Sequence, residues 1–217
     1  MNIKNKIRLA LLNLSKSNLI ITQHWNLLDA NGKSIYKNSK VSDSLVGNFL
    51  QKLYCNFSNF NTTNWTASNY NGATANNAHI IGITGANIII AGSDQGYMAS
   101  VAGDLSAGII FGTGTTAPSA LDYKIETIIP EGVGANQLSY AVMLGSVAPS
   151  SFGFDTTFRV QRSATNNTGN DVPVSEVALY LKNAYGTFCI YRDLYTPSVT
   201  VPNLQTLNTI IEFKITT

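Results

Sequence analysis

The stretch from Phe111 to Phe213 decides the fold, because strand-like segments follow one another there with turn residues between them. It begins FGTGTTAPSALDYKIETII (111–129), continues FRVQRSATNNTGNDVPVSEVALYL (158–181) and ends FCIYRDLYTPSVTVPNLQTLNTIIEF (188–213). Short apolar runs bounded by Asn, Gly and Pro are typical of antiparallel sheets. The sequence therefore predicts a mainly β protein, an antiparallel β-sandwich of the jelly-roll type.

Several segments of this region are expected to be strands, each bounded by turn residues. In one of them, TTFRVQRSA, apolar or small residues alternate with Arg159, Gln161 and Ser163. Such alternation predicts a strand with one buried face and one solvated face. The expected strands are 124–129, 137–144, 156–164, 174–181, 187–194 and 209–216.

The N-terminal part predicts a hairpin followed by a helix. Two apolar runs within 18–41 are joined by Asp29-Ala30-Asn31-Gly32, and Asn-Gly supplies the positive φ angles of a tight turn. Ser42-Asp43 can cap a helix whose apolar residues recur at spacings of three and four. These residues are Leu45, Val46, Phe49, Leu50, Leu53 and Tyr54. We expect a basic arm, hairpin and helix (1–55) as an appendage to a sandwich (56–217), the two forming one compact unit.

The low charge of the chain favours assembly over catalysis. Only 12% of the 217 residues are charged, against about 25% in typical soluble proteins. A neutral, hydrogen-bonding surface lets copies lie against one another with little repulsion, although an ordinary soluble domain can also carry one. The basic N-terminal part lacks interleaved aromatics and Arg-rich runs, so nucleic acid is not expected as a partner.

No pattern of residues indicates a reaction centre. His24 and His79 lack acidic or cysteine companions at metal-ligand spacing. The glycine-rich GTGTTAPS is not followed by Lys-Ser/Thr, so a turn is favoured over a phosphate loop. Cys55 and Cys189 are interpreted as small buried side chains, and sequence spacing leaves their pairing open. We therefore expect no enzyme, and no catalytic, metal or cofactor site.

Two groups of residues are candidates for contacts. Trp65 and Tyr70 lie in an Asn-, Thr- and Gly-rich segment, where exposed aromatics can bind a sugar or protein or can instead anchor a loop to the body. Glu176, Arg192 and Asp193 lie among apolar strands. Since an unpaired buried ion is costly, a structural ion pair across neighbouring strands is predicted, with a subunit contact as the alternative.

Residues 109–217 resemble the C-terminal part of virion structural proteins of prokaryotic viruses. The resemblance rests on GTGTTAPSALDYKIE (112–126), VSEVALY (174–180) and IYRDLYTPSVTVPNLQTL (190–207), in that order. In such proteins a GTGT-x-P-x-x-x-DY segment precedes an EVxLY strand and an RD-x-x-x-x-P-V-x-VP-x-x-Q-x-L segment. Glycine is common in their VPNGQTL turn, where this chain has Leu204.

The resemblance implies a role and a set of partners. It implies a component of the virion, in a tail, neck, nozzle, adaptor or minor capsid position, that contacts copies of itself and other virion proteins. The alternative is a module of the virion that binds a receptor or glycan on the host surface, for which Trp65 and Tyr70 are the candidate contacts. No cofactor is implied by either function.

Overall fold

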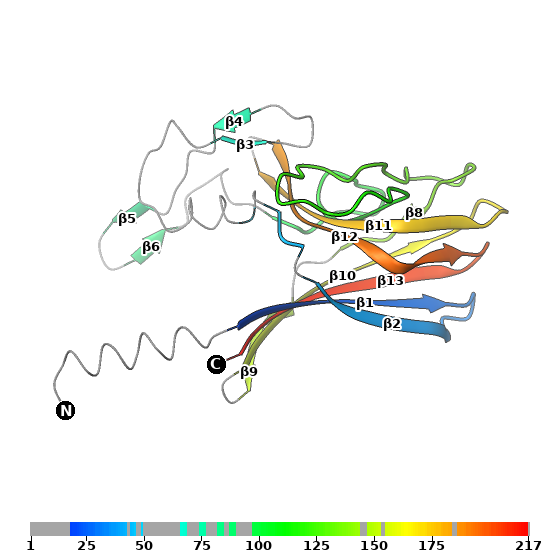
Figure 1. Cartoon of the computed structure of the whole chain (residues 1–217), viewed down its shortest axis with the longest axis horizontal. Coiled ribbons are helices and arrows are strands. Elements are labelled where there is room, and N and C mark those ends of the chain that lie inside the picture. The colour runs from blue at the N-terminus through cyan, green and yellow to red at the C-terminus, as the bar shows by residue number, and fades with distance from the viewer. Residues whose placement is uncertain are drawn as a thin grey trace.

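The computed structural model describes residues 18–42, 44–46, 49, 66–68, 74–76, 82–84, 87–89, 97–143, 147–152, 155–183 and 186–216. These residues form a mainly β, sandwich-like structure of antiparallel sheets with almost no helix (Figure 1). The strands are β1 (Asn18–Leu28), β2 (Ser34–Ser42), β3 (Thr66–Ser68), β4 (Thr74–Asn76), β5 (Gly82–Thr84), β6 (Asn87–Ile89), β7 (Gly108–Gly112), β8 (Ser139–Tyr140), β9 (Val147–Phe152), β10 (Asp155–Thr165), β11 (Val172–Asn183), β12 (Gly186–Val201) and β13 (Thr206–Thr216).

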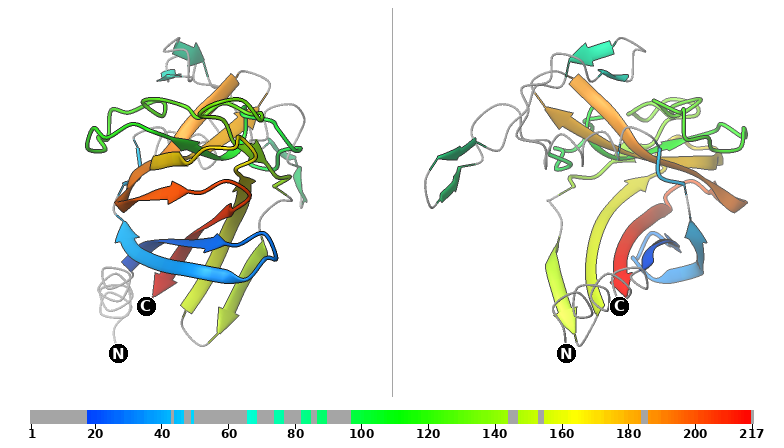
Figure 2. Two further views of the ribbon diagram at one scale, coloured as in Figure 1. Left: turned by 90° about the vertical axis from the view of Figure 1, so that its right-hand side faces the viewer. Right: turned by 60° about the vertical axis from the view of Figure 1, so that its left-hand side comes forward.

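Two sheets make up the body. Sheet A has six strands in the order β2-β1-β13-β10-β8, with β9 also paired to β10, and sheet B has the order β12-β11-β7. Figure 2 shows β10 and β13 curving strongly beneath sheet B. The strands β3–β4 and β5–β6 form two small separate pairs. The expected strands at 156–164, 174–181, 187–194 and 209–216 are confirmed as β10, β11, β12 and β13.

The predicted hairpin is confirmed as β1–β2, but it is not an appendage. The Asp29 carboxylate accepts bonds from the amides of Asn31 and Lys33, both at 2.9 Å, and Gly32 has a φ of 78°. Beyond this turn, β1 pairs with β13 over all 11 of its residues. The hairpin is therefore an integral part of sheet A.

The core lies between the two sheets and follows from the alternation of side chains along the strands. In β1 every second residue from Ile21 to Leu27 is buried. Trp25 is 2% exposed and packs edge-on against Tyr195 of β12, with ring centroids 5.3 Å apart. Burying such aromatic surface is among the largest favourable contributions to folding. The main core cluster thus joins residues of β1, β10 and β13 to residues of β7, β11 and β12.

An irregular layer, formed by residues 113–129, covers the other face of sheet B. Ile125 packs there in a second apolar cluster with Ala178, Tyr180 and Cys189. The Tyr180 hydroxyl accepts a bond from the Ile125 amide at 2.7 Å. The expected strand at 124–129 is therefore wrong: the segment lies in this irregular layer, and its one β-bridge joins Ile128 to Gly112. Its apolar residues are explained by packing on two sides, since Ile125 is buried in this second cluster and Ile129 in the main core cluster.

The predicted helix does not begin at Leu45. Ser42 belongs to β2, and Leu45 forms an isolated antiparallel β-bridge with Tyr191 of β12. The Val46 amide also donates to the Ile190 carbonyl at 3.3 Å, so residues 44–46 lie along the outer edge of sheet B. Phe49 is helical; Leu50, Leu53 and Tyr54 lie outside the described residues.

Candidate functional site

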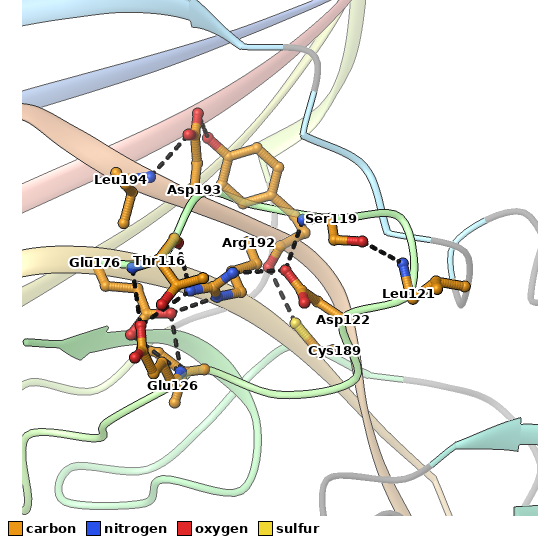
Figure 3. A network of polar contacts seen from close by, with 12 residues as sticks. Thr116, Ser119, Leu121, Asp122, Glu126, Glu176, Cys189, Arg192, Asp193 and Leu194 are labelled. Atoms are coloured by element: carbon orange, nitrogen blue, oxygen red, sulfur yellow. Dashed lines mark hydrogen bonds and ion pairs between the residues drawn. The ribbon is translucent and has the colours of Figure 1, made fainter. Parts of the chain in front are cut away.

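Arg192 is the centre of a buried ion network on the outer face of sheet B (Figure 3). Its side chain is 3% exposed, and its Nε donates to Glu176, whose side chain is fully buried. The other guanidinium nitrogens donate to Asp122 Oδ2 at 2.6 Å and to the Thr116 carbonyl at 3.0 Å. Burial opposes the charge, but the bonds to Asp122 and Glu176 leave the pKa of Arg192 raised above its ordinary value.

The same network holds the irregular layer against sheet B. The Glu176 carboxylate accepts the amide of Glu126, at 2.9 Å for Oε1, and the amide of Thr127. A Cβ at Gly112 would lie 2.6 Å from the Thr127 carbonyl, and one at Gly114 would collide with Glu176. The glycines of GTGT are therefore required because the chain passes directly over this carboxylate. The GTGT segment is thus the part of the chain that passes over the buried pair of Glu176 and Arg192.

Asp193 does not join this network, although it is adjacent to Arg192. It faces sheet A, where its Oδ1 accepts a bond from Lys40 Nζ at 2.8 Å and its Oδ2 accepts one from the Ser42 hydroxyl. Both partners lie on β2, so the contact joins the edge strands of the two sheets. The structure thus brings together Glu176 and Arg192, as a cross-strand pair requires, and directs Asp193 across the sandwich instead.

Arg162 is a second buried cation, outside the predicted ion pair. It is 1% exposed and lies on the inward face of β10. Its guanidinium donates to five backbone carbonyls, including Ala141 at 2.9 Å and Asp104 at 2.7 Å. The guanidinium also lies 4.9 Å from the ring centroid of Tyr140, and burial lowers its pKa. The alternation in FRVQR places this arginine on the buried face, and that signal could have identified it.

The inward face of sheet A is incompletely covered at one end. Residues that pair directly across the strands form rows on this face. Gln23, Ile211 and Val160 form a buried row, whereas Leu19 and Ile215 form a row in which each is 47% exposed. The row between them contains Phe158 and Phe213, partly buried with centroids 5.5 Å apart. We call Leu19, Phe158, Phe213 and Ile215 the apolar end of sheet A.

The remaining sequence candidates contribute less. Trp65, Tyr70, His79 and Cys55 lie outside the described residues, so a glycan- or receptor-binding role for Trp65 and Tyr70 stays a prediction. Cys189 is buried, as predicted: its Sγ donates to the Tyr191 carbonyl at 3.3 Å, and burial raises its pKa.

Comparison of the chain with protein-family models, with curated proteins and with solved structures finds no match. In the described part of the chain, His, Cys, Asp and Glu side chains do not gather in groups of three or more that could hold a metal ion. A search of the same residues finds no helix of the length and apolar character that a membrane crossing requires.

Proposed function

We propose that the protein is a virion structural protein of a prokaryotic virus, folded as a jelly-roll-like sandwich, which assembles with copies of itself and with other particle proteins. The resemblance of residues 109–217 to such proteins supports the proposal. Its low content of charged residues, 12%, also supports it, since little repulsion opposes close packing of copies. The proposed role is structural and needs no catalytic centre.

The observation that carries the proposal is the apolar end of sheet A. Leu19 and Ile215 are each about half exposed, and they continue the surface formed by Phe158 and Phe213. Contiguous exposed apolar residues in a folded protein mark contact surfaces. Each Å² of such surface covered by a neighbour contributes about 25 cal/mol. A neighbouring subunit that covered this end would therefore stabilise the assembly.

The edge of β2 is a second candidate contact. Among the described strands, β2 is hydrogen-bonded only to β1, which leaves its other edge without a strand. Ile35 and Val41 on β2 are 49% and 73% exposed. An edge strand with exposed apolar side chains can accept a strand from a neighbour. Lys37, an exposed cation on the same strand, would restrict which neighbour is accepted.

The substitution Ile215→Asp tests the proposal. It places a charge on the apolar end, and the matched control Leu121→Asp places the same charge on a loop residue that is 89% exposed. We expect the native chain and the control to form a defined oligomer by size-exclusion chromatography with light scattering, and Ile215→Asp to dissociate. Thermal melting of each variant reports whether the fold is kept, and Leu19→Asp repeats the test from β1.

Mass spectrometry of purified virus particles tests the location. The proposal predicts that the chain is present in particles at a fixed copy number. A native chain that stays monomeric at high concentration and is missing from purified particles would refute it.

A further inference from the structure

A hollow of about 610 Å³ lies on the outer face of sheet A, the face turned away from sheet B. It extends across β2, β1, β13 and β10, which lie side by side in Figure 2. Its volume is in the range of small-molecule sites, about 300–1,000 Å³. The polar side chains that line it include His24, Asn26, Lys37, Ser39, Arg159 and Asn208.

The strand register explains why these polar groups lie together. Asn26 is directly opposite Lys37 on one side and Asn208 on the other. In the next row, His24 lies between Ser39 and Ile210. Side chains in such rows have Cβ atoms about 5 Å apart. The floor of the hollow therefore consists of amide, imidazole, hydroxyl and ammonium groups, together with the aliphatic side chain of Ile210.

At Asn26 and Asn208, neighbouring side chains bind the amide oxygens, and none of the described residues accepts a bond from their amide N–H groups. Asn26 Oδ1 accepts a bond from the Ser34 hydroxyl at 2.6 Å. Asn208 Oδ1 accepts bonds from Gln161 Nε2 at 2.9 Å and from the Ser163 hydroxyl at 3.0 Å. Each asparagine has two N–H donors on its other terminal atom. The hollow is therefore rich in donors, and it favours a ligand that supplies acceptor oxygens.

The charges lining the hollow have one sign. Lys37 and Arg159 both line it, and none of the described residues that line it is acidic. Arg159 Nε pairs with Glu212, but a guanidinium has about four further N–H donors. Ionised acceptors such as carboxylate or sulfate form the strongest hydrogen bonds with such groups. The positive charge of the hollow and its many hydrogen-bond donors both favour an anionic ligand.

We propose that this hollow binds an acidic saccharide, a sugar bearing carboxylate or sulfate groups. Hydroxyl groups of the sugar match the amide and hydroxyl floor, and its acid group matches Lys37 and Arg159. A nucleic-acid strand fits less well, because such strands are usually held by stacking of bases on aromatic rings. Trp25 also borders the hollow, but its ring packs against Tyr195 in the core. This inference does not depend on the assembly function proposed above.

Saturation-transfer NMR, which observes the ligand and works for large assemblies, tests the proposal with trigalacturonic acid. Its fully methyl-esterified form is the matched uncharged probe, and an oligothymidylate is the nucleic-acid probe. We expect saturable transfer to the acid at concentrations up to about 10 mM and none to the ester. Equal transfer to acid and ester, no transfer to the acid, or tighter binding of the oligothymidylate would overturn the proposal.

Two variants locate the binding. Asn208→Asp keeps the oxygen that accepts from Gln161 and Ser163 but replaces the N–H donors with a negative oxygen, and Lys37→Ala removes a cation. We expect each to weaken binding of the acid at least about tenfold, since each removes a charge-assisted contact. The matched control is Lys124→Ala, because Lys124 is an exposed residue of the irregular layer on sheet B and does not line the hollow. Unchanged affinity in both Asn208→Asp and Lys37→Ala, or an equal loss in Lys124→Ala, would place the ligand elsewhere and refute the inference.

Discussion

Arg192 on β12 and Glu176 on β11 are diagonal neighbours across their two strands. The register sets Arg192 opposite Ala178, two residues along β11 from Glu176, so both ionic side chains project from the same face of sheet B. That face is covered by the irregular layer, which supplies Asp122 and the Thr116 carbonyl as further partners of the guanidinium. The pair is therefore a structural joint between a sheet and the loop above it.

Replacing Arg192 with Met should destabilise the fold by about 3–5 kcal/mol, because Glu176 would remain buried without its cation. Glu176→Gln should cost less, since Asp122 still faces Arg192. The double variant should cost less than the sum of the two. The control is Arg159→Met, whose pair with Glu212 is exposed and should contribute at most about 1 kcal/mol. Urea unfolding measures all four, and equal losses in Arg192→Met and Arg159→Met would contradict the assignment.

Gly112→Ala should destabilise the protein by about 1–3 kcal/mol, as overpacking does. The new methyl group would lie 2.6 Å from a backbone oxygen, that of Thr127, which cannot move without displacing the loop. Gly134→Ala is the comparison, since its methyl group would meet only the end of the Gln137 side chain. Unfolding midpoints in urea should fall markedly for the first variant and little for the second.

Leu204→Gly should stabilise the protein by about 0.5–1 kcal/mol, the reverse of the usual effect of glycine. Leu204 has a φ of 64° and is 56% exposed, so it carries backbone strain without burying its side chain. The turn amide bond from Leu204 to the Asn166 carbonyl, 2.7 Å, remains in the variant. Val133→Gly, at a residue 64% exposed without a positive φ, should destabilise instead. Opposite signs in the two variants, measured by thermal melting, would verify the strain.

Acid should loosen the layer over sheet B. The pKa of Glu126 is lowered from its ordinary value because its carboxylate accepts hydrogen bonds from Thr116 and Thr115. A lowered pKa in the folded state stabilises the fold above the ordinary value of 4.5, and this contribution disappears as the pH falls through the lowered pKa. Urea midpoints should therefore decrease below pH 4.5, and the decrease should be smaller in Glu126→Gln. An identical pH dependence in both proteins would contradict this account.

The local sequence pattern was enough to predict several of the strands. β10 and β13 could be recognised because buried and less buried residues alternate along them, and β11 because it is an apolar run bounded by turn residues. The β1–β2 turn could be recognised because Asn-Gly favours the positive φ that Gly32 adopts. The cross-strand pair of Glu176 and Arg192 could also be predicted from the sequence, because opposite charges within apolar strands need partners.

Long-range pairing could not be predicted in the same way. The sequence of β1 does not indicate that it pairs with β13, because strand pairing depends on how the whole core packs. Ile125 and Ile129 were misleading because an irregular segment also needs apolar residues where it packs, Ile125 against the outer face of sheet B and Ile129 in the main core. The hollow on sheet A arises from four strands laid side by side, so its donors become neighbours only once the sheet has formed.

The pairing of β1 with β13 also governs when the protein can finish folding. Leu28 pairs with Thr206 and Asn18 with Thr216, so the middle of sheet A cannot form until a segment about 180 to 200 residues later in the chain has been synthesised. A ribosome-bound chain that lacks β13 holds its first hairpin with no neighbour on one side. During translation, that hairpin is a site where chaperones, or premature contacts between nascent chains, can act.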